Sequence, residues 1–219
     1  MALLNEKDAK IVHERLSQMA GNVKLALFTQ ESECDYCGQT QELVDELAGL
    51  SSGKLTVEIH DLVKDSVRAE SLHIDKAPAL AVLGPADEDR GLRFFGIPAG
   101  YEFASLLESI DLVARGDSGL APAIREKLHA LKEPLNLQVF VTPTCPYCPK
   151  AVVTAFKMAM ESPLVTASMV EATEFPELAS KYQVSGVPHT VIGESPQPMI
   201  GAYPEGAAVD MVLSATLRD

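Results

Sequence analysis

Two periodicities of apolar residues divide this chain into helices and strands. Apolar side chains spaced three and four residues apart predict amphipathic helices, whereas short apolar or alternating runs predict strands. The expected helices span 6–19, 34–50, 66–72, 101–114, 124–131, 145–160, 175–182 and 205–217. The expected strands span 23–29, 55–59, 79–83, 92–95, 135–142, 164–170, 189–192 and 199–200. Strands thus alternate with helices throughout, which predicts an α/β fold with a mixed sheet.

The order of elements repeats once along the chain. Cys34 corresponds to Cys145 at an offset of 111 residues, and Pro78 corresponds to Pro188 at an offset of 110 residues. Landmarks that keep their register over this distance predict two copies of one structural unit. Because the period has the size of a domain, the repeat is a tandem pair and not a solenoid.

The junction between the copies is expected at 115–119, which holds two glycines, two charged residues and no apolar residue. We therefore expect an N-terminal domain at 1–117 and a C-terminal domain at 118–219. A chain of 219 residues is long enough to give each copy its own core.

Each copy carries a Cys-x-x-Cys pair directly after its first strand and at the start of a helix. The pairs are Cys34 with Cys37, and Cys145 with Cys148. Unpaired N–H groups and the macrodipole at a helix N-terminus stabilise a thiolate, the form of cysteine that attacks disulfides. A spacing of two residues lets such a pair close a disulfide and reopen it by exchange. Two pairs in the same context therefore predict redox chemistry.

The net charge and the positions of the cysteines reduce the number of possible functions. The net charge of −13 makes nucleic acid and anionic membranes poor partners. The N-terminal stretch lacks the basic start and long apolar run of a signal peptide, and no apolar stretch has the length of a transmembrane helix. All four cysteines belong to the two pairs. We therefore expect a cytoplasmic protein, in which paired cysteines indicate catalysis or metal binding.

The order of strand, Cys-x-x-Cys helix, proline-initiated strand, hairpin and final helix resembles the thioredoxin and glutaredoxin pattern. Two copies, each with a dithiol, resemble the glutaredoxin-like protein disulfide oxidoreductases of thermophilic prokaryotes. The Cys145-Pro146-Tyr147-Cys148 motif, which is found in glutaredoxins, is the most specific mark of this resemblance. It covers nearly the whole chain and implies two tandem thioredoxin-like domains, each with a central mixed β-sheet flanked by helices.

The resemblance also implies roles for individual residues. Cys145 and Cys34 would be the attacking thiols, Cys148 and Cys37 the resolving thiols, and Pro188 and Pro78 would follow cis peptide bonds. A cis-proline facing a dithiol would leave the backbone of the preceding residue free to pair with an extended substrate. The expected substrate contacts are therefore Val187, Pro188, Ala77 and Pro78, together with the tyrosines inside the motifs, Tyr147 and Tyr36. A trans proline that merely starts an edge strand is the alternative.

This implied enzyme reduces, forms or isomerises disulfides of protein substrates, and needs no cofactor beyond its redox-active cysteines. A flavoprotein resembling thioredoxin reductase is the expected electron donor. An alternative is a relay that passes electrons from a flavin reductase to a peroxidase.

Two features of the relatives are missing here. The strands before the dithiols, 25–28 and 137–140, lack the buried carboxylate of thioredoxins, so the sequence identifies no proton acceptor for the resolving thiol. The stretches 193–195 and 201–203 do not match the glutathione-binding motif of glutaredoxins.

Other interpretations remain open at this point. The four cysteines could bind one tetrahedral zinc ion. The whole chain could instead be a non-catalytic interaction module, or one copy could be an inert docking domain without catalysis. His189 could modulate Cys145 or simply be a strand side chain. Lys150, in the first turn after the second dithiol, could stabilise the Cys145 thiolate or face solvent.

Overall fold

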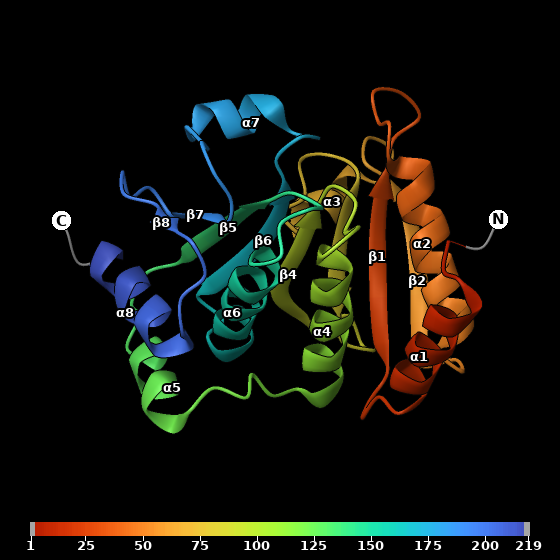
Figure 1. Cartoon of the computed structure of the whole chain (residues 1–219), viewed down its shortest axis with the longest axis horizontal. Coiled ribbons are helices and arrows are strands. Elements are labelled where there is room, and N and C mark those ends of the chain that lie inside the picture. The colour runs from red at the N-terminus through yellow and green to blue at the C-terminus, as the bar shows by residue number, and fades with distance from the viewer. Residues whose placement is uncertain (1–2, 217–219) are drawn as a thin grey trace.

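Eight strands form one sheet in the computed structural model of the chain, which describes residues 3–216 (Figure 1). The strands are β1 (Val23–Thr29), β2 (Leu55–Asp61), β3 (Ala79–Leu83), β4 (Asp89–Phe95), β5 (Leu135–Val141), β6 (Val165–Glu171), β7 (His189–Ile192) and β8 (Met199–Ile200). The helices are α1 (Glu6–Ser17), α2 (Cys37–Leu50), α3 (Ser66–Ser71), α4 (Glu102–Arg115), α5 (Pro122–His129), α6 (Cys148–Glu161), α7 (Pro176–Lys181) and α8 (Glu205–Thr216).

These elements confirm the predicted order and the mixed α/β class. Strand β2 runs two residues beyond the predicted end, and β4 begins three residues earlier than predicted because the hairpin turn after β3 is shorter. Residue 217, the predicted end of the last helix, and residues 1–2 of the N-terminal stretch lie outside the described part of the chain. No helix within 3–216 combines the length and apolarity needed to cross a bilayer.

The sheet consists of two four-stranded halves in the order β2-β1-β3-β4 and β6-β5-β7-β8. Within each half, the first two strands of the repeat pair in parallel and the remaining pairings are antiparallel. The halves join where β4 pairs in parallel with β6, from Leu92 with Ala167 to Phe95 with Val170. The sequence predicted a sheet in each copy, and this pairing merges the two sheets into one.

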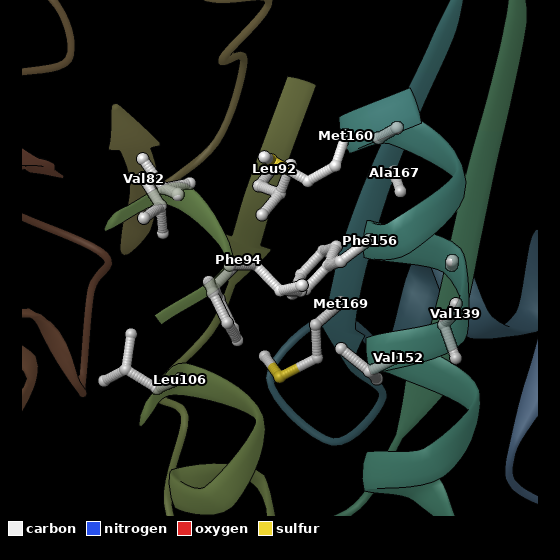
Figure 2. Packing of buried hydrophobic residues seen from close by; sticks show 14 of the residues in the cluster. Val82, Leu92, Phe94, Leu106, Val139, Val152, Phe156, Met160, Ala167 and Met169 are labelled. Atoms are coloured by element: carbon white, nitrogen blue, oxygen red, sulfur yellow. The ribbon is translucent and has the colours of Figure 1, made fainter. Parts of the chain in front are cut away.

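Helices cover the two faces of the sheet unequally. The larger apolar cluster lies under α1, α2, α4, α5, α6 and α8, and the smaller one lies under α3 and α7. Both clusters contain residues from both halves of the chain. Figure 2 shows the centre of the larger cluster, where Phe94 of β4 and Phe156 of α6 lie among Leu92, Leu106 and Met169. The halves therefore share buried apolar surface across the seam between β4 and β6.

Candidate active site

Each Cys-x-x-Cys pair forms a disulfide at the N-terminus of a helix, as the sequence predicted. Cys34 is bonded to Cys37 and Cys145 to Cys148, with Cα atoms 5.5 Å apart in each pair. The second cysteine of each pair is the first residue of its helix, α2 or α6. The first cysteine lies in the loop that enters the helix, near the free N–H groups of the first turn.

The strand directions place both dithiols at the same edge of the sheet. Strands β1 and β5, which precede the dithiols, run parallel to each other through the pairings with β3, β4 and β6. Four inter-strand steps separate them, a distance of about 19 Å. A zinc ion with Zn–S bonds of about 2.3 Å cannot bridge two pairs so placed. Within residues 3–216, no group of three or more His, Cys, Asp or Glu side chains has the arrangement of a metal site.

The first cysteine of each pair is the more accessible one. Cys34 is half-buried, whereas Cys37 is 7% exposed. In the second pair, Cys145 is 7% exposed and Cys148 is fully buried. An external disulfide therefore reaches Cys34 or Cys145 before it reaches the partner sulfur.

A cis-proline lies at the same edge of the sheet as each dithiol. The peptide bonds Ala77–Pro78 and Val187–Pro188 are both cis, which confirms this part of the prediction. Strand pairing aligns the residue after each proline with the end of the strand that leads to the dithiol: Ala79 with Phe28, and His189 with Phe140.

The surroundings of the two prolines differ in accessibility. Val187 is half-buried and Ala77 is buried. Tyr147 is 71% exposed and Tyr36 is 40% exposed, so both tyrosines present part of their rings to solvent beside a dithiol.

Two other side chains considered from sequence have different surroundings: His189 lies apart from the sulfurs, and Lys150 faces solvent. The ring of His189 is buried edge-on against Phe140, with centroids 6.2 Å apart, and burial lowers the pKa of His189. Phe140 belongs to the cluster under α7, whereas Cys145 and Cys148 belong to the cluster under α6. The sheet thus separates the imidazole from the dithiol. Lys150 is solvent-exposed in the first turn of α6.

A buried carboxyl group that sequence reasoning missed lies at the start of α4. Glu102 is 1% exposed, and its Oε2 accepts a hydrogen bond of 2.6 Å from the Ser105 hydroxyl. Its Oε1 is buried without a partner among the described residues. Burial raises the pKa of Glu102 to about 7. Because α4 packs against α6, this carboxyl group lies in the layer that holds Cys148.

The segment before Glu102 connects the two sites. The Gly96 amide donates to the carbonyl oxygen of Pro78, beside the first dithiol. The Ile97 amide donates to Glu174 Oε1 at 2.7 Å, and the Tyr101 amide donates to the carbonyl oxygen of Pro143 at 3.0 Å, two residues before Cys145. Residues 96–101 therefore span from the first cis-proline to the second dithiol.

Known proteins are similar to this chain in sequence. A family model described as a thioredoxin domain matches residues 135–213. The chain is 27% identical over 179 residues to an alkyl hydroperoxide reductase component of Staphylococcus epidermidis, covering 80% of this chain and 31% of that protein. It is 26% identical over 172 residues to an NADH dehydrogenase of Bacillus subtilis, covering 78% of this chain and 31% of that protein. The chain thus spans about a third of the length of these curated relatives.

Two solved structures superpose on nearly the whole chain. A structure of the alkyl hydroperoxide reductase component AhpF of Enterococcus faecalis has a TM-score of 0.87 and 26% identity, covering 95% of this chain and 99% of that one. A protein disulfide oxidoreductase from Aeropyrum pernix has a TM-score of 0.88 and 31% identity, covering 96% of this chain and 93% of that one. With two thioredoxin folds, two Cys-x-x-Cys disulfides and two cis-prolines, the chain belongs to the protein disulfide oxidoreductase family.

Proposed function

We propose that this oxidoreductase exchanges disulfides with protein substrates chiefly at its second dithiol, with Cys145 as the attacking residue and Cys148 as the resolving one. The observation that carries the proposal is the placement of the Cys145–Cys148 disulfide at the N-terminus of α6, at the same sheet edge as the cis bond before Pro188. Cys34 and Cys37 have the same roles in the first half, at Pro78.

Reduction of a substrate starts from the open dithiol. The Cys145 thiolate attacks one sulfur of the substrate disulfide, and the other substrate sulfur leaves and takes up a proton. Cys148 then loses its proton and attacks the Cys145 sulfur, which closes the enzyme disulfide and releases the second substrate thiol. Two electrons pass from the dithiol to the substrate. Oxidation of a substrate runs through the same mixed disulfide in the opposite direction.

Glu102 supplies the proton acceptor that the strands before the dithiols lack. Cys148 is fully buried, so water has poor access to its thiol proton. A carboxyl group with a pKa of about 7 in the same helical layer exchanges protons readily near neutral pH. This makes Glu102 the group that deprotonates Cys148 as the mixed disulfide is resolved.

Protein substrates bind as an extended strand against the residues before the cis-prolines. The backbone of Val187 forms no hydrogen bond to other groups within residues 3–216, and it is therefore free to pair with a substrate backbone. Backbone pairing is tolerant of substrate sequence. Tyr147, with most of its ring in solvent, contacts the substrate beside the sulfurs. Ala77 and Tyr36 have these roles at the first site.

The two dithiols exchange electrons with partner proteins and not directly with each other. The strands that lead to them, β1 and β5, lie about 19 Å apart, so the dithiols cannot exchange disulfides directly, since the attacking and attacked sulfurs must touch. A flavoprotein disulfide reductase is the electron donor that we propose, supported by the similarity to alkyl hydroperoxide reductase components. For electron transfer the chain needs no cofactor beyond its redox-active cysteines. It works in the reducing cytoplasm, where it contributes to redox homeostasis. A relay to a peroxidase is the second candidate, supported by the same relatives.

Insulin reduction by dithiothreitol tests the proposal. The protein should accelerate insulin precipitation, and prior alkylation of its reduced thiols should abolish the acceleration. Cys145→Ser should remove most of the activity, whereas Cys34→Ser should leave a substantial part. The opposite ranking of the two variants would make the first dithiol the main site. Activity that survives alkylation would refute the dithiol mechanism.

A further inference from the structure

We infer that Tyr101, a residue of the first half, is a substrate-contacting residue of the second dithiol, and that this site prefers extended polypeptide disulfides flanked by apolar side chains. The inference rests on the proposed function and names the substrate class of that site. Neither the motifs nor the repeat assigns a role to Tyr101.

Backbone contacts fix Tyr101 beside the second dithiol. Its amide donates a hydrogen bond of 3.0 Å to the carbonyl oxygen of Pro143. Cys145 follows two residues later, within about 7 Å along even a fully extended chain. Gly100 has φ +61°, and a Cβ at this position would collide with the same carbonyl oxygen. The close approach of the two halves therefore requires glycine at position 100, and it places the Tyr101 side chain within reach of a substrate bound at Cys145.

The fold gives no structural reason for the exposure of the Tyr101 ring. It is 52% exposed, although 47% of the chain is hydrophobic and most large apolar side chains are buried. Tyr101 is the N-cap residue of α4, but its side chain makes no capping hydrogen bond. Helix α4 and the contact with Pro143 thus depend on the backbone at this position, and the ring is free to contact a ligand.

Two further tyrosines reach the same edge from different segments. Tyr147 precedes the first residue of α6 and is 71% exposed. Tyr203 is 36% exposed in the loop that begins at Gly201, whose amide donates to the carbonyl oxygen of Pro188 at 2.8 Å. Three of the five tyrosines in the chain therefore lie around the second dithiol and its cis-proline. We call Tyr101, Tyr147 and Tyr203 the tyrosine rim.

The chemistry of the rim selects its ligand. A tyrosine ring is rigid and amphipathic, so it offers apolar contact to many side chains at a low cost in conformational entropy. The motif around Cys145 contains no carboxylate, although the chain carries a net charge of −13. Apolar contact is thus the main interaction that the rim offers to residues on either side of a substrate disulfide. A small disulfide reaches the sulfurs and cannot touch the rim.

Steady-state kinetics with two substrates test the inference, in a chain whose first dithiol is removed by Cys34→Ser and Cys37→Ser. One substrate is a disulfide-bridged peptide of about ten residues with leucine and phenylalanine beside the cysteines, and the other is hydroxyethyl disulfide. Tyr101→Ala should raise KM for the peptide about three- to tenfold, the range of one aromatic contact, with little change in kcat. The rate with hydroxyethyl disulfide should not change, which also shows that the variant is folded.

Matched variants distinguish a direct contact between Tyr101 and the substrate from an effect of the substitution on the folded structure. Tyr101→Phe keeps the ring and should retain the parent KM for the peptide. Ile11→Ala removes a side chain of similar exposure, 55%, from α1. It should change neither the KM for the peptide nor the rate with hydroxyethyl disulfide. An unchanged peptide KM in Tyr101→Ala, or equal losses with both substrates, would overturn the inference. A parent chain inactive on both disulfides would instead refute the proposed function.

Discussion

The rings of Phe94 and Phe156 lie edge to face with their centroids 5.1 Å apart, although they belong to different halves of the chain (Figure 2). Both are fully buried. Phe94 lies on β4, which pairs with β6 across the seam, and Phe156 lies on α6, which carries the second dithiol. The contact therefore couples the core of the first half to the helix of the second site.

Phe156→Ala should lower the free energy of unfolding by about 3–5 kcal/mol, because it removes a large buried ring and leaves a cavity at the seam. Chemical denaturation followed by circular dichroism measures this loss. Ile11→Ala, at an exposed position, should change stability by no more than about 0.5 kcal/mol. A loss below about 1 kcal/mol in Phe156→Ala would show that the seam contributes little to stability.

We propose that the domain boundary falls between residues 117 and 118, and that residues 118–219 fold alone with reduced stability. This fragment keeps β5, β6, β7 and β8 but loses the pairing of β6 with β4 and the packing of α6 against α4. It should melt cooperatively at a lower temperature than the full chain. A fragment without a cooperative transition would mean that the copies in the sequence are not independent folding units.

Glu102→Gln should stabilise the protein at pH 8 and have little effect near pH 4.5. Burial raises the pKa of Glu102 from 4.5 to about 7, so the folded chain binds more protons than the unfolded chain between these values. Stability from this group is therefore lost as the pH rises from about 4.5 to 7, and the penalty is complete above pH 7. The expected gain at pH 8 is on the order of 3 kcal/mol. Denaturation curves at both pH values measure it.

The exposed glutamate Glu126 provides the control for this experiment. Glu126→Gln should leave the difference in stability between the two pH values as it is in the parent. An equal gain for Glu102→Gln at pH 4.5 and pH 8 would show that folding does not raise the pKa of Glu102.

Glu102→Gln should also slow the resolution of the mixed disulfide between Cys145 and the substrate. Glutamine cannot accept the Cys148 proton, and general-base catalysis contributes about 100-fold or more where it operates. Rapid-mixing experiments that follow release of the second substrate thiol measure this step. A resolution rate equal to that of the parent at pH 7 would assign the proton to water instead.

The Cys145–Cys148 pair should have the less negative reduction potential of the two dithiols. Lys150 lies one turn beyond Cys145, whereas Glu31, Glu33 and Asp35 flank Cys34, and like charge disfavours a thiolate. A more stable thiolate favours the reduced dithiol.

The structure limits the size of this difference. Glu31, Glu33 and Asp35 are all solvent-exposed, and Glu31 forms an ion pair with Lys64 at 2.5 Å. We expect a gap no larger than about 40–70 mV. Titration in glutathione buffers of two variants, each keeping one dithiol, measures it. Equal potentials, or a more negative value for Cys145–Cys148, would rule out downhill transfer from the first dithiol, through a partner, to the second.

The sequence alone determined the features that depend on neighbours within a few residues. Helical and strand periodicity, the two Cys-x-x-Cys motifs after strands, and the repeat at about 110 residues predicted the tandem fold and the paired cysteines. These predictions succeeded because a helix start, a strand and a dithiol are each specified by local spacing.

The tertiary structure decided what depends on contacts between distant segments. The choice of β6 as the partner of β4 is an edge-to-edge pairing that no local pattern encodes. Glu102 is 43 residues from Cys145, and an acidic residue in a first helical turn is ordinarily a solvated partner of the helix dipole. One signal was present: Glu102 shares the i, i+4 spacing of buried Leu106 and Ile110, which places a carboxyl group on an apolar stripe. Only the packing of α4 against α6 shows which site that buried carboxyl group can serve, because burial and the resulting pKa arise from the surrounding fold and not from the residue itself.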